Sequence, residues 1–249
     1  MDDRTLVLAR LARTMALQTD SDPLPHRLCR SATDVLGAEG GAITLAYTGP
    51  ERVTLCVTDD RAARLEDLQD LLGQGPGPTA YRTGHQVHVL VGDGDRRWPQ
   101  FESSVLEAFG PINVHAIPIR PDHTTLGVFT CHVGSDRGLL LGRSSAQFLA
   151  DAVGVALLRD PAAPVDVPGR PPGTSDEDKQ APWSSRAQVH QATGMVVAQL
   201  GIGPADALAL LRAHAFARGA TLDEVAAFVT DRVLDFSQID DQTTRSTDS

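Results

Sequence analysis

The chain has 249 residues, a length that suits one large domain or two modest ones. Hydrophobic residues make up 41% and charged residues 22%, as in ordinary globular proteins, and the formal net charge of −10 excludes the basic coat of a non-specific nucleic-acid binder. No apolar run approaches the roughly 18 residues that cross a bilayer, and acids stand where a signal peptide carries positive charge. We therefore expect a cytoplasmic protein without membrane contact.

The three cysteines, Cys29, Cys56 and Cys131, lie far apart and follow neither a Cys-x-x-Cys nor a Cys/His metal spacing. Such a scattered set is typical of reduced, buried thiols, and a redox or catalytic thiol remains the alternative. We expect no metal ion and no other cofactor.

Two changes in composition divide the chain. Residues 159–182 are rich in proline, poor in apolar side chains and charged at their end, which indicates a semi-extended linker because proline fixes φ and lacks a backbone donor. The last residues, 237–249, are polar and predict a disordered tail. The predicted domains are therefore 1–158 and 183–236.

The first domain has the pattern of an α+β fold, with helices at both ends of a five-stranded antiparallel sheet. Its opening helix has an apolar stripe through Leu6, Leu8, Leu11, Met15 and Leu17, and Ser144 with Gln147 predicts a capping box at the start of its last helix. In chain order, the pattern predicts helices over 4–17 and 24–36, strands over 40–47 and 52–59, a helix over 61–72, a glycine-rich loop over 73–84, a strand over 85–91, a short helix over 98–109, strands over 112–120 and 124–133, and a closing helix over 144–158.

Two short motifs belong to this layout: Thr83-Gly84-x-x-Val87-x-Val89 after the glycine-rich loop, and the strand 126–130, Leu-Gly-Val-Phe-Thr. With the element order, they make residues 1–158 resemble a GAF domain. The resemblance implies a signalling module that holds a small ligand or dimerises. It implies neither cyclic-nucleotide binding, because the Asn-Lys-Phe-Asp-Glu signature is absent, nor chromophore attachment, because the adjacent Cys131 and His132 fall inside a predicted strand.

The glycine-rich loop and the histidines of this domain suggest ligands but predict no clear site. Glycines at 73, 75 and 77 suggest a phosphate cradle, yet Pro76 and Pro78 remove donors and no Lys-Ser/Thr follows, so we favour a structural turn beside a ligand pocket. His85 and His88 are three residues apart on a strand and so lie on opposite faces, which gives no chelating pair. The histidines considered for metal or haem are His85, His88, His115, His123 and His132.

The C-terminal segment has the pattern of a small bundle of three helices, over 184–200, 204–218 and 221–236. Pro204 suits the first turn of the second helix, Gly219 suits its C-terminus, and Thr221 with Glu224 predicts a capping box for the third. The buried stripes are expected to run through Val189, Ala192, Val196 and Leu200, through Ala207, Leu208, Leu211 and Ala215, and through Leu222, Val225, Val229, Val233 and Phe236.

The residue pattern of this bundle is similar to that of an ANTAR domain. The matching positions are Arg186, Val189, Gln191 to Met195, Leu200, Gly201, Ala207, Leu211, Arg212, Ala215, Leu222, Val225 and Ala226. The resemblance implies an RNA-binding module that grips paired hairpin loops of nascent transcripts and prevents a terminator from forming. ANTAR modules are commonly attached to a sensor, so the whole chain resembles a GAF and ANTAR domain-containing antitermination regulator of the actinobacterial type, acting as a homodimer.

The candidate RNA-binding residues of the first helix are four neighbours. Gln191 and Thr193 are the polar groups best able to read a base edge, although solvated surface residues are the alternative. Ala192 and Gly194 permit either close approach of RNA or close helix packing. The family often has lysine where this chain has Thr193, so a neutral hydroxyl replaces a charge that seeks phosphate.

Three arginines complete the candidate set. Arg186 and Arg212 are expected to contact phosphate or stack on a base, and Arg218 is a weaker candidate of the same kind; ordinary surface arginines are the alternative. Residues 183–236 contain four arginines against five acids, a net charge of −1. Recognition must then depend more on stacking and base edges than on phosphate charge.

No Ser/His/Asp, Cys/His or paired-carboxylate arrangement emerges from the spacing, so we expect no enzymatic activity. One alternative is a protein-interaction or dimerisation regulator that does not bind RNA. A further alternative is a thiol-dependent sulfoxide reductase of the GAF fold that uses Cys56 or Cys131.

Overall fold

The computed structural model describes residues 3–18, 22–46, 52–122, 124–159 and 182–237, with side chains from Gln188 onward in the last range. The chain divides into two compact units, Met1–Pro172 and Gly173–Ser249, which are described separately. The predicted linker, 159–182, and tail, 237–249, lie almost entirely outside the described residues, so the predicted domain limits remain predictions.

The first unit is built on a five-stranded sheet in which every neighbouring pair is antiparallel. The strand order is β2-β1-β5-β4-β3, so the central strand is β5 and the edges are β2 and β3. The strands are β1 (Gly40–Leu45), β2 (Val53–Val57), β3 (Val87–Leu90), β4 (Ile112–Ile119) and β5 (Gly127–Gly134).

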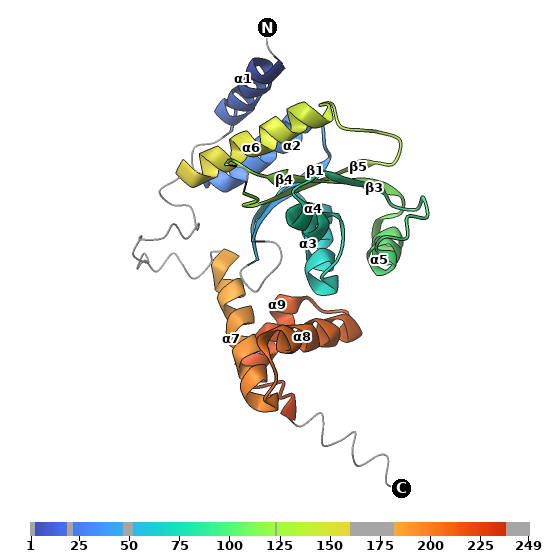
Figure 1. Ribbon diagram of the computed structural model, residues 1–249, viewed down its shortest axis with the longest axis vertical. Coiled ribbons are helices and arrows are strands. Elements are labelled where there is room, and N and C mark those ends of the chain that lie inside the picture. Colours follow the sequence, from blue (N-terminus) through green and yellow to red (C-terminus); the bar gives the residue numbers. More distant parts are fainter. Residues whose placement is uncertain (1–2, 19–21, 47–51, 123, 160–181, 238–249) are drawn as a thin grey trace. The chain divides into compact units, whose positions relative to one another are not determined.

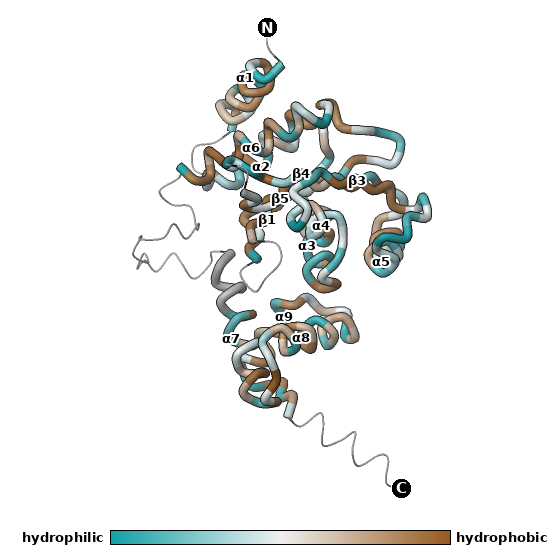
Figure 2. Tube along the Cα trace, viewed as in Figure 1, coloured by the Kyte–Doolittle hydropathy of each residue, from teal (hydrophilic) through white to brown (hydrophobic). Residues whose placement is uncertain are grey.

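Helices cover both faces of this sheet (Figure 1). One face carries α1 (Asp3–Ala16), α2 (Leu24–Leu36) and α6 (Arg143–Arg159), and the other side carries α3 (Asp60–Leu72), α4 (Pro76–Thr83) and α5 (Pro99–Phe109). Successive side chains along a strand point to opposite faces of the sheet, so each strand contributes to a hydrophobic core on either side. In β4, Ile117 and Ile119 face α2 and α6, whereas Val114 and Ala116 face α3 to α5. Figure 2 shows the central strands as hydrophobic stretches. The predicted α+β fold is confirmed.

Three local predictions for the first unit were wrong: the glycine-rich loop, the apolar stripe of the first helix and the capping box of the last helix. The glycine-rich loop is largely the helix α4, because Pro76 starts the helix and Gly75 precedes it at φ 139°, where a β-carbon would meet the side chain of Gln69. On α1 the buried residues are Val7 and Leu11, and the leucines at 6, 8 and 17 are exposed.

The predicted capping box at the start of the last helix of this unit does not form. The helix α6 begins at Arg143, so Ser144 already lies in its first turn. The amide of Gln147 donates to Pro118 O at 2.7 Å and to Asp151 Oδ1 at 2.9 Å, which ties α6 to the end of β4.

A buried ionic cluster joins β2 to α3. The guanidinium of Arg52, which is only 3% exposed, lies 2.7 Å from Glu66 Oε2 and 2.7 Å from Asp70 Oδ2. Thr44 on β1 donates to Glu66 Oε2 at 2.7 Å, and the Gln69 amide donates to Glu66 Oε1 at 3.0 Å. The desolvated charges are therefore paired and hydrogen-bonded, as buried charges must be.

The second unit is a three-helix bundle of α7 (Pro182–Leu200), α8 (Pro204–Arg218) and α9 (Leu222–Thr230), as predicted. Pro204 lies in the first turn of α8, Gly219 caps its end in the left-handed conformation, and Thr221 with Glu224 forms both bonds of a capping box. The predicted stripes are buried except for Leu200, which is half-buried, and Val233. The third helix ends earlier than expected: Val233 is 74% exposed after a turn, and Phe236 packs as a buried residue beyond it.

Within the described ranges, no single helix is long and apolar enough to span a membrane. One bent pair, Gln188–Leu200 with Pro204–Arg218, reaches the required length and composition together, at an angle of 106°. The apolar residues of this pair include the buried stripes of the bundle.

Candidate functional site

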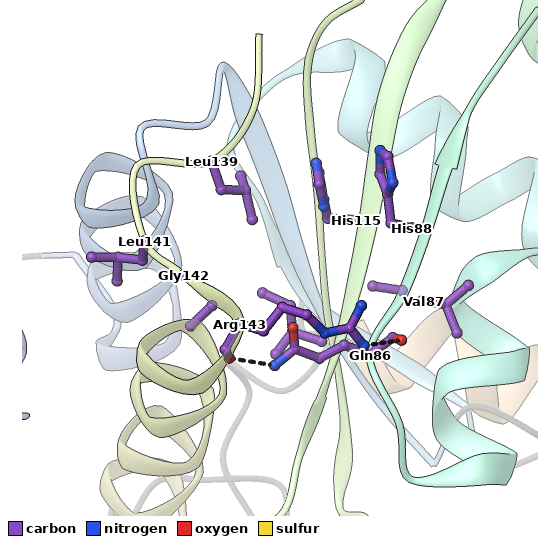
Figure 3. A pocket seen from close by; sticks show the side chains of 11 residues that line it. Gln86, Val87, His88, His115, Leu139, Leu141, Gly142 and Arg143 are labelled. Atoms are coloured by element: carbon purple, nitrogen blue, oxygen red, sulfur yellow. Dashed lines mark hydrogen bonds between the residues drawn. The ribbon is translucent and has the colours of Figure 1, made fainter. Parts of the chain in front are cut away.

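A pocket of about 310 Å³ opens on the face of the sheet that carries α6 (Figure 3). Three separate segments form it: the start of β3, the middle of β4, and the loop that leads into α6 together with the first turn of that helix. Its lining residues are Gln86, Val87, His88, His115, Ala116, Ile117, Leu139, Leu141, Gly142, Arg143 and Ala146. The glycines at 73, 75 and 77 do not line this pocket. The structural turn that was expected beside a ligand pocket is therefore not next to this one.

Two imidazole rings stack at the edge of this pocket. His88 on β3 and His115 on β4 are direct cross-strand partners, and their ring centroids lie 4.4 Å apart at an interplanar angle of 18°. His88 Nε2 lies 2.7 Å from Asn113 Oδ1, while Asn113 Nδ2 donates to three backbone carbonyl groups, of which the nearest is Arg137 O at 3.0 Å. Since that amide is oriented by three acceptors, His88 Nε2 carries the proton.

His115 is held neutral by its surroundings. Burial, followed by electrostatic repulsion from His88 and Arg143, lowers the pKa of His115 to about 4. Arg143 reaches across the pocket and donates to Gln86 O at 3.1 Å, and Gln86 Nε2 returns a bond to Arg143 O at 2.7 Å. The pocket therefore combines one fixed cation, neutral imidazole and apolar walls, which suits binding more than proton transfer.

The remaining predicted ligand groups lie elsewhere. His132, which is buried on β5, contacts Asp59 Oδ2 at 3.0 Å, and Asp59 also caps α3 through Ala62 N. His85 is exposed, and His123 lies outside the described residues. Among the residues that the structure covers, no three His, Cys, Asp or Glu side chains gather as metal ligands.

The three cysteines, remote in sequence, all belong to the core between the sheet and α2. Burial raises the pKa of Cys131 to about 12, and hydrogen bonding to Cys56, followed by burial, raises the pKa of Cys29. Both effects oppose formation of the reactive thiolate that thiol chemistry requires.

The phosphate-cradle alternative for the glycines 73–77 meets a direct obstacle. The Gly77 amide donates to Gln69 Oε1 at 2.7 Å, and this bond is buried. The structural role of this segment is therefore to start α4 rather than to hold an anion.

In the bundle, the four neighbouring motif residues of α7 divide between two sides. Gln191 and Gly194 are exposed, and a β-carbon on Gly194 would meet nothing within 4 Å. Ala192 is fully buried, and Thr193 is 6% exposed with its hydroxyl donating to Val189 O at 2.7 Å. This burial favours packing for Ala192 and Thr193 and leaves Gln191 and Gly194 accessible.

The arginine candidates of α8 are accessible to different degrees. Arg218 is exposed and Arg212 is half-buried. Phe216, which sequence reasoning missed, is 53% exposed and lies one helical turn from Arg212, so the two side chains share a face of α8. The sequence did carry a signal for Phe216: it lies outside the apolar stripe of α8, so an exposed aromatic side chain could have been predicted there. The side chain of Arg186 lies outside the described residues.

His214 is half-buried on α8 beside Phe236, with ring centroids 5.4 Å apart. Burial, followed by the charge of Arg218, lowers the pKa of His214. Protonation of His214 therefore adds no charge to the bundle surface near neutral pH.

Family comparisons agree with this division into two units. The GAF domain model matches residues 22–157, more than half of the chain. The chain belongs to the GAF domain family. The ANTAR domain model matches residues 177–229, which contain the bundle helices except for the last residue of α9. A GAF domain joined to an ANTAR domain is the composition of a signal-transduction regulator of transcription antitermination.

Two solved structures of GAF domains are similar to the chain. The GAF-B domain of DevS from Mycobacterium smegmatis is 19% identical, with a TM-score of 0.37 over 53% of this chain and 89% of that one. The GAF domain of A. aeolicus Nlh2 in an inactive state is 11% identical, with a TM-score of 0.38 over 62% of this chain and 90% of that one. No curated protein matches the sequence.

Proposed function

We propose that the protein is a signal-responsive, RNA-binding transcription antiterminator of the actinobacterial type that acts in the cytoplasm. The GAF domain senses a small ligand or mediates dimerisation, and the ANTAR bundle binds hairpin loops in nascent RNA. The family match over 177–229 carries this proposal, because it coincides with a folded three-helix bundle that keeps Gln191 of the motif on its surface.

The proposed RNA contacts come from the accessible side of the motif. Gln191 supplies base-edge hydrogen bonds, and Gly194 permits close approach of the RNA backbone. Phe216 stacks on an unpaired base, and Arg212 beside it contacts phosphate or stacks in turn. Such contacts suit a bundle whose net charge is −1, since loop recognition depends less on phosphate neutralisation than duplex binding does.

The GAF domain is proposed to pair with a second copy through its terminal helices. Leu6 and Leu8 are exposed on α1, and Leu158 is exposed at the end of α6, which packs against α1. Exposed leucines on adjoining helices favour a homodimer, and a paired-hairpin RNA suits two copies of the bundle.

A second candidate function is an interaction module that does not bind RNA. The observation in its favour is the number of large apolar side chains that the bundle exposes, since such groups also serve protein contacts. They are Leu210, Phe216, Phe228 and Val233.

The decisive experiment measures binding of the full chain to a double-hairpin leader RNA from its own genome by fluorescence anisotropy at two salt concentrations. We expect Arg212→Ala and Phe216→Ala each to weaken binding by about 1–3 kcal/mol, on the scale of one lost stacking or specific contact. Arg212→Ala should also reduce the slope of log affinity against log salt by about one.

The matched control for charge is Arg232→Ala, an exposed arginine of the same unit, which should leave affinity nearly unchanged. Phe216→Trp keeps an aromatic face and should retain binding. If the wild-type chain binds no double-hairpin leader, the interaction-module alternative replaces the RNA proposal.

A further inference from the structure

Among the described residues, the lining of the pocket beside α6 includes one arginine and no acidic residue, although the chain as a whole carries a net charge of −10. Arg143 is the charged group at its side. His88 and His115 add two imidazoles within the same space. In an acidic protein, a concave site with a cation and no carboxylate favours an anionic ligand.

The electrostatic surroundings of His115 also favour an anionic ligand. Burial, followed by electrostatic repulsion from His88 and Arg143, lowers the pKa of His115 to about 4. A bound anion would offset this repulsion and restore a more ordinary protonation of the imidazole. An anion beside Arg143 and His115 would therefore be electrostatically favoured.

The remaining walls determine the shape of the ligand. Figure 3 shows His115 between His88 and Leu139, so one face of the His115 ring stacks on His88 and the other lies toward the loop that leads into α6. Leu139, Leu141 and Ile117 supply an apolar surface there. A volume of about 310 Å³ lies at the small end of ligand pockets, which suits a compact molecule.

We propose that this pocket binds a small aromatic carboxylate, with the carboxylate on the Arg143 guanidinium and the flat ring between His115 and Leu139. The planar fork of arginine matches a carboxylate in geometry as well as charge. The ring gains an aromatic face on one side and aliphatic contacts on the other. This assigns a ligand class to the sensor role within the proposed function, but its test uses no RNA, so either proposal can fail while the other stands.

The test uses the full chain with benzoate as the probe, and benzamide and inorganic phosphate as comparison ligands. Binding is followed by NMR of the histidine ring signals and by titration calorimetry. We expect benzoate to shift the signals of His88 and His115 and to move the titration of His115 to higher pH. We expect benzamide, which lacks the charge, and phosphate, which lacks the ring, each to bind at least about tenfold more weakly.

Substitution identifies the cation. Arg143 is exposed, so Arg143→Gln should fold normally and weaken benzoate binding by about tenfold or more, the effect of losing one hydrogen bond to a charged group. Arg61→Gln removes an exposed arginine on α3, across the sheet, and should leave the affinity unchanged.

Three results would overturn the assignment. Equal affinity for benzamide would remove the role of charge, and equal affinity for phosphate would remove the role of the ring. Undisturbed His88 and His115 signals at saturating benzoate would place the binding outside this pocket.

Discussion

At the scale of single residues, Arg52 is the cation of a buried ionic cluster in the first unit. It lies between Glu66 and Asp70 on α3, and all three are buried. A buried ion pair of this kind adds little compared with an apolar replacement of the whole cluster, but removing one member leaves a charge without compensation. Both carboxylates pair with this one guanidinium.

We expect Arg52→Met to lower the free energy of unfolding by about 3–5 kcal/mol, because the carboxylates of Glu66 and Asp70 would remain buried without their cation. Urea denaturation of the full chain measures this change. The matched control is Arg97→Met, which removes an exposed arginine paired with Asp95 and should cost no more than about 1 kcal/mol. Equal effects of the two substitutions would contradict the structural role of the cluster.

His115 makes stability depend on pH. Its pKa of about 4 in the folded protein lies below the ordinary value of 6.5, so the unfolded chain binds the proton more readily. The stability that the neutral ring confers is fully present above pH 6.5 and is lost as the pH falls from 6.5 toward 4. Because the ring is partly exposed, we expect this loss to be only about 2 kcal/mol.

The variant His115→Gln should remove that part of the pH dependence. The measurement is urea denaturation at several pH values between 7 and 4, with the difference between wild type and variant taken at each value. His85→Gln, which changes an exposed histidine of the same domain, is the control and should leave the curve unchanged. A wild-type curve that parallels the His115→Gln curve would contradict the assigned pKa.

At the scale of elements, α1 leaves most of its residues exposed. Val7 and Leu11 are its buried residues, and it packs on α2 and α6. Arg4 reaches the ring of Phe148 on α6, at 5.3 Å from its centroid. An amphipathic helix that also exposes leucines has apolar surface left for a second contact.

We expect Leu8→Glu to convert the proposed dimer into a monomer, because it places a charge in the apolar contact while leaving the folded core intact. Light scattering of the full chain at micromolar concentration measures the mass. The control is Leu106→Glu on α5, which changes a leucine of similar exposure on the opposite side of the sheet and should leave the dimer unchanged. A wild-type monomer would exclude the proposed pairing.

At the scale of the whole molecule, the chain consists of two units with separate cores. The sheet with its six helices buries one set of apolar residues on each face, and the bundle buries its own. Since each unit satisfies its own hydrophobic residues, each is expected to remain folded when the chain between them is cut.

Limited proteolysis should therefore cut first between Arg159 and Pro182, where the sequence is proline-rich and poor in apolar residues. The expected product is a folded fragment close to residues 1–158, identified by mass spectrometry and by retained circular dichroism. First cuts within the sheet region, 41–133, would contradict the two-domain division.

The amino-acid sequence by itself determined the order and type of nearly all elements and both domain families. This was possible because the signals are local: alternation in strands, apolar stripes in helices, and the capping pair Thr221 and Glu224. The sequence pattern predicted a loop where α4 forms, because the glycines of this segment hid the preference of Pro76 for the first turn of a helix. The pattern also predicted that the third bundle helix continues beyond Thr230, because Val233 has the spacing of the apolar stripe. In the structure the helix ends at Thr230 and Val233 is exposed.

Only the tertiary structure decided the candidate pocket and the accessibility of the motif. His88 and His115 meet because β3 and β4 pair in one register, and Arg143 joins them through a loop that is remote in sequence. Which of the residues 191–194 face inward depends on how α8 and α9 pack against α7. Local pattern predicts a helix and its apolar stripe, whereas a pocket arises from contacts between segments that no short-range signal encodes.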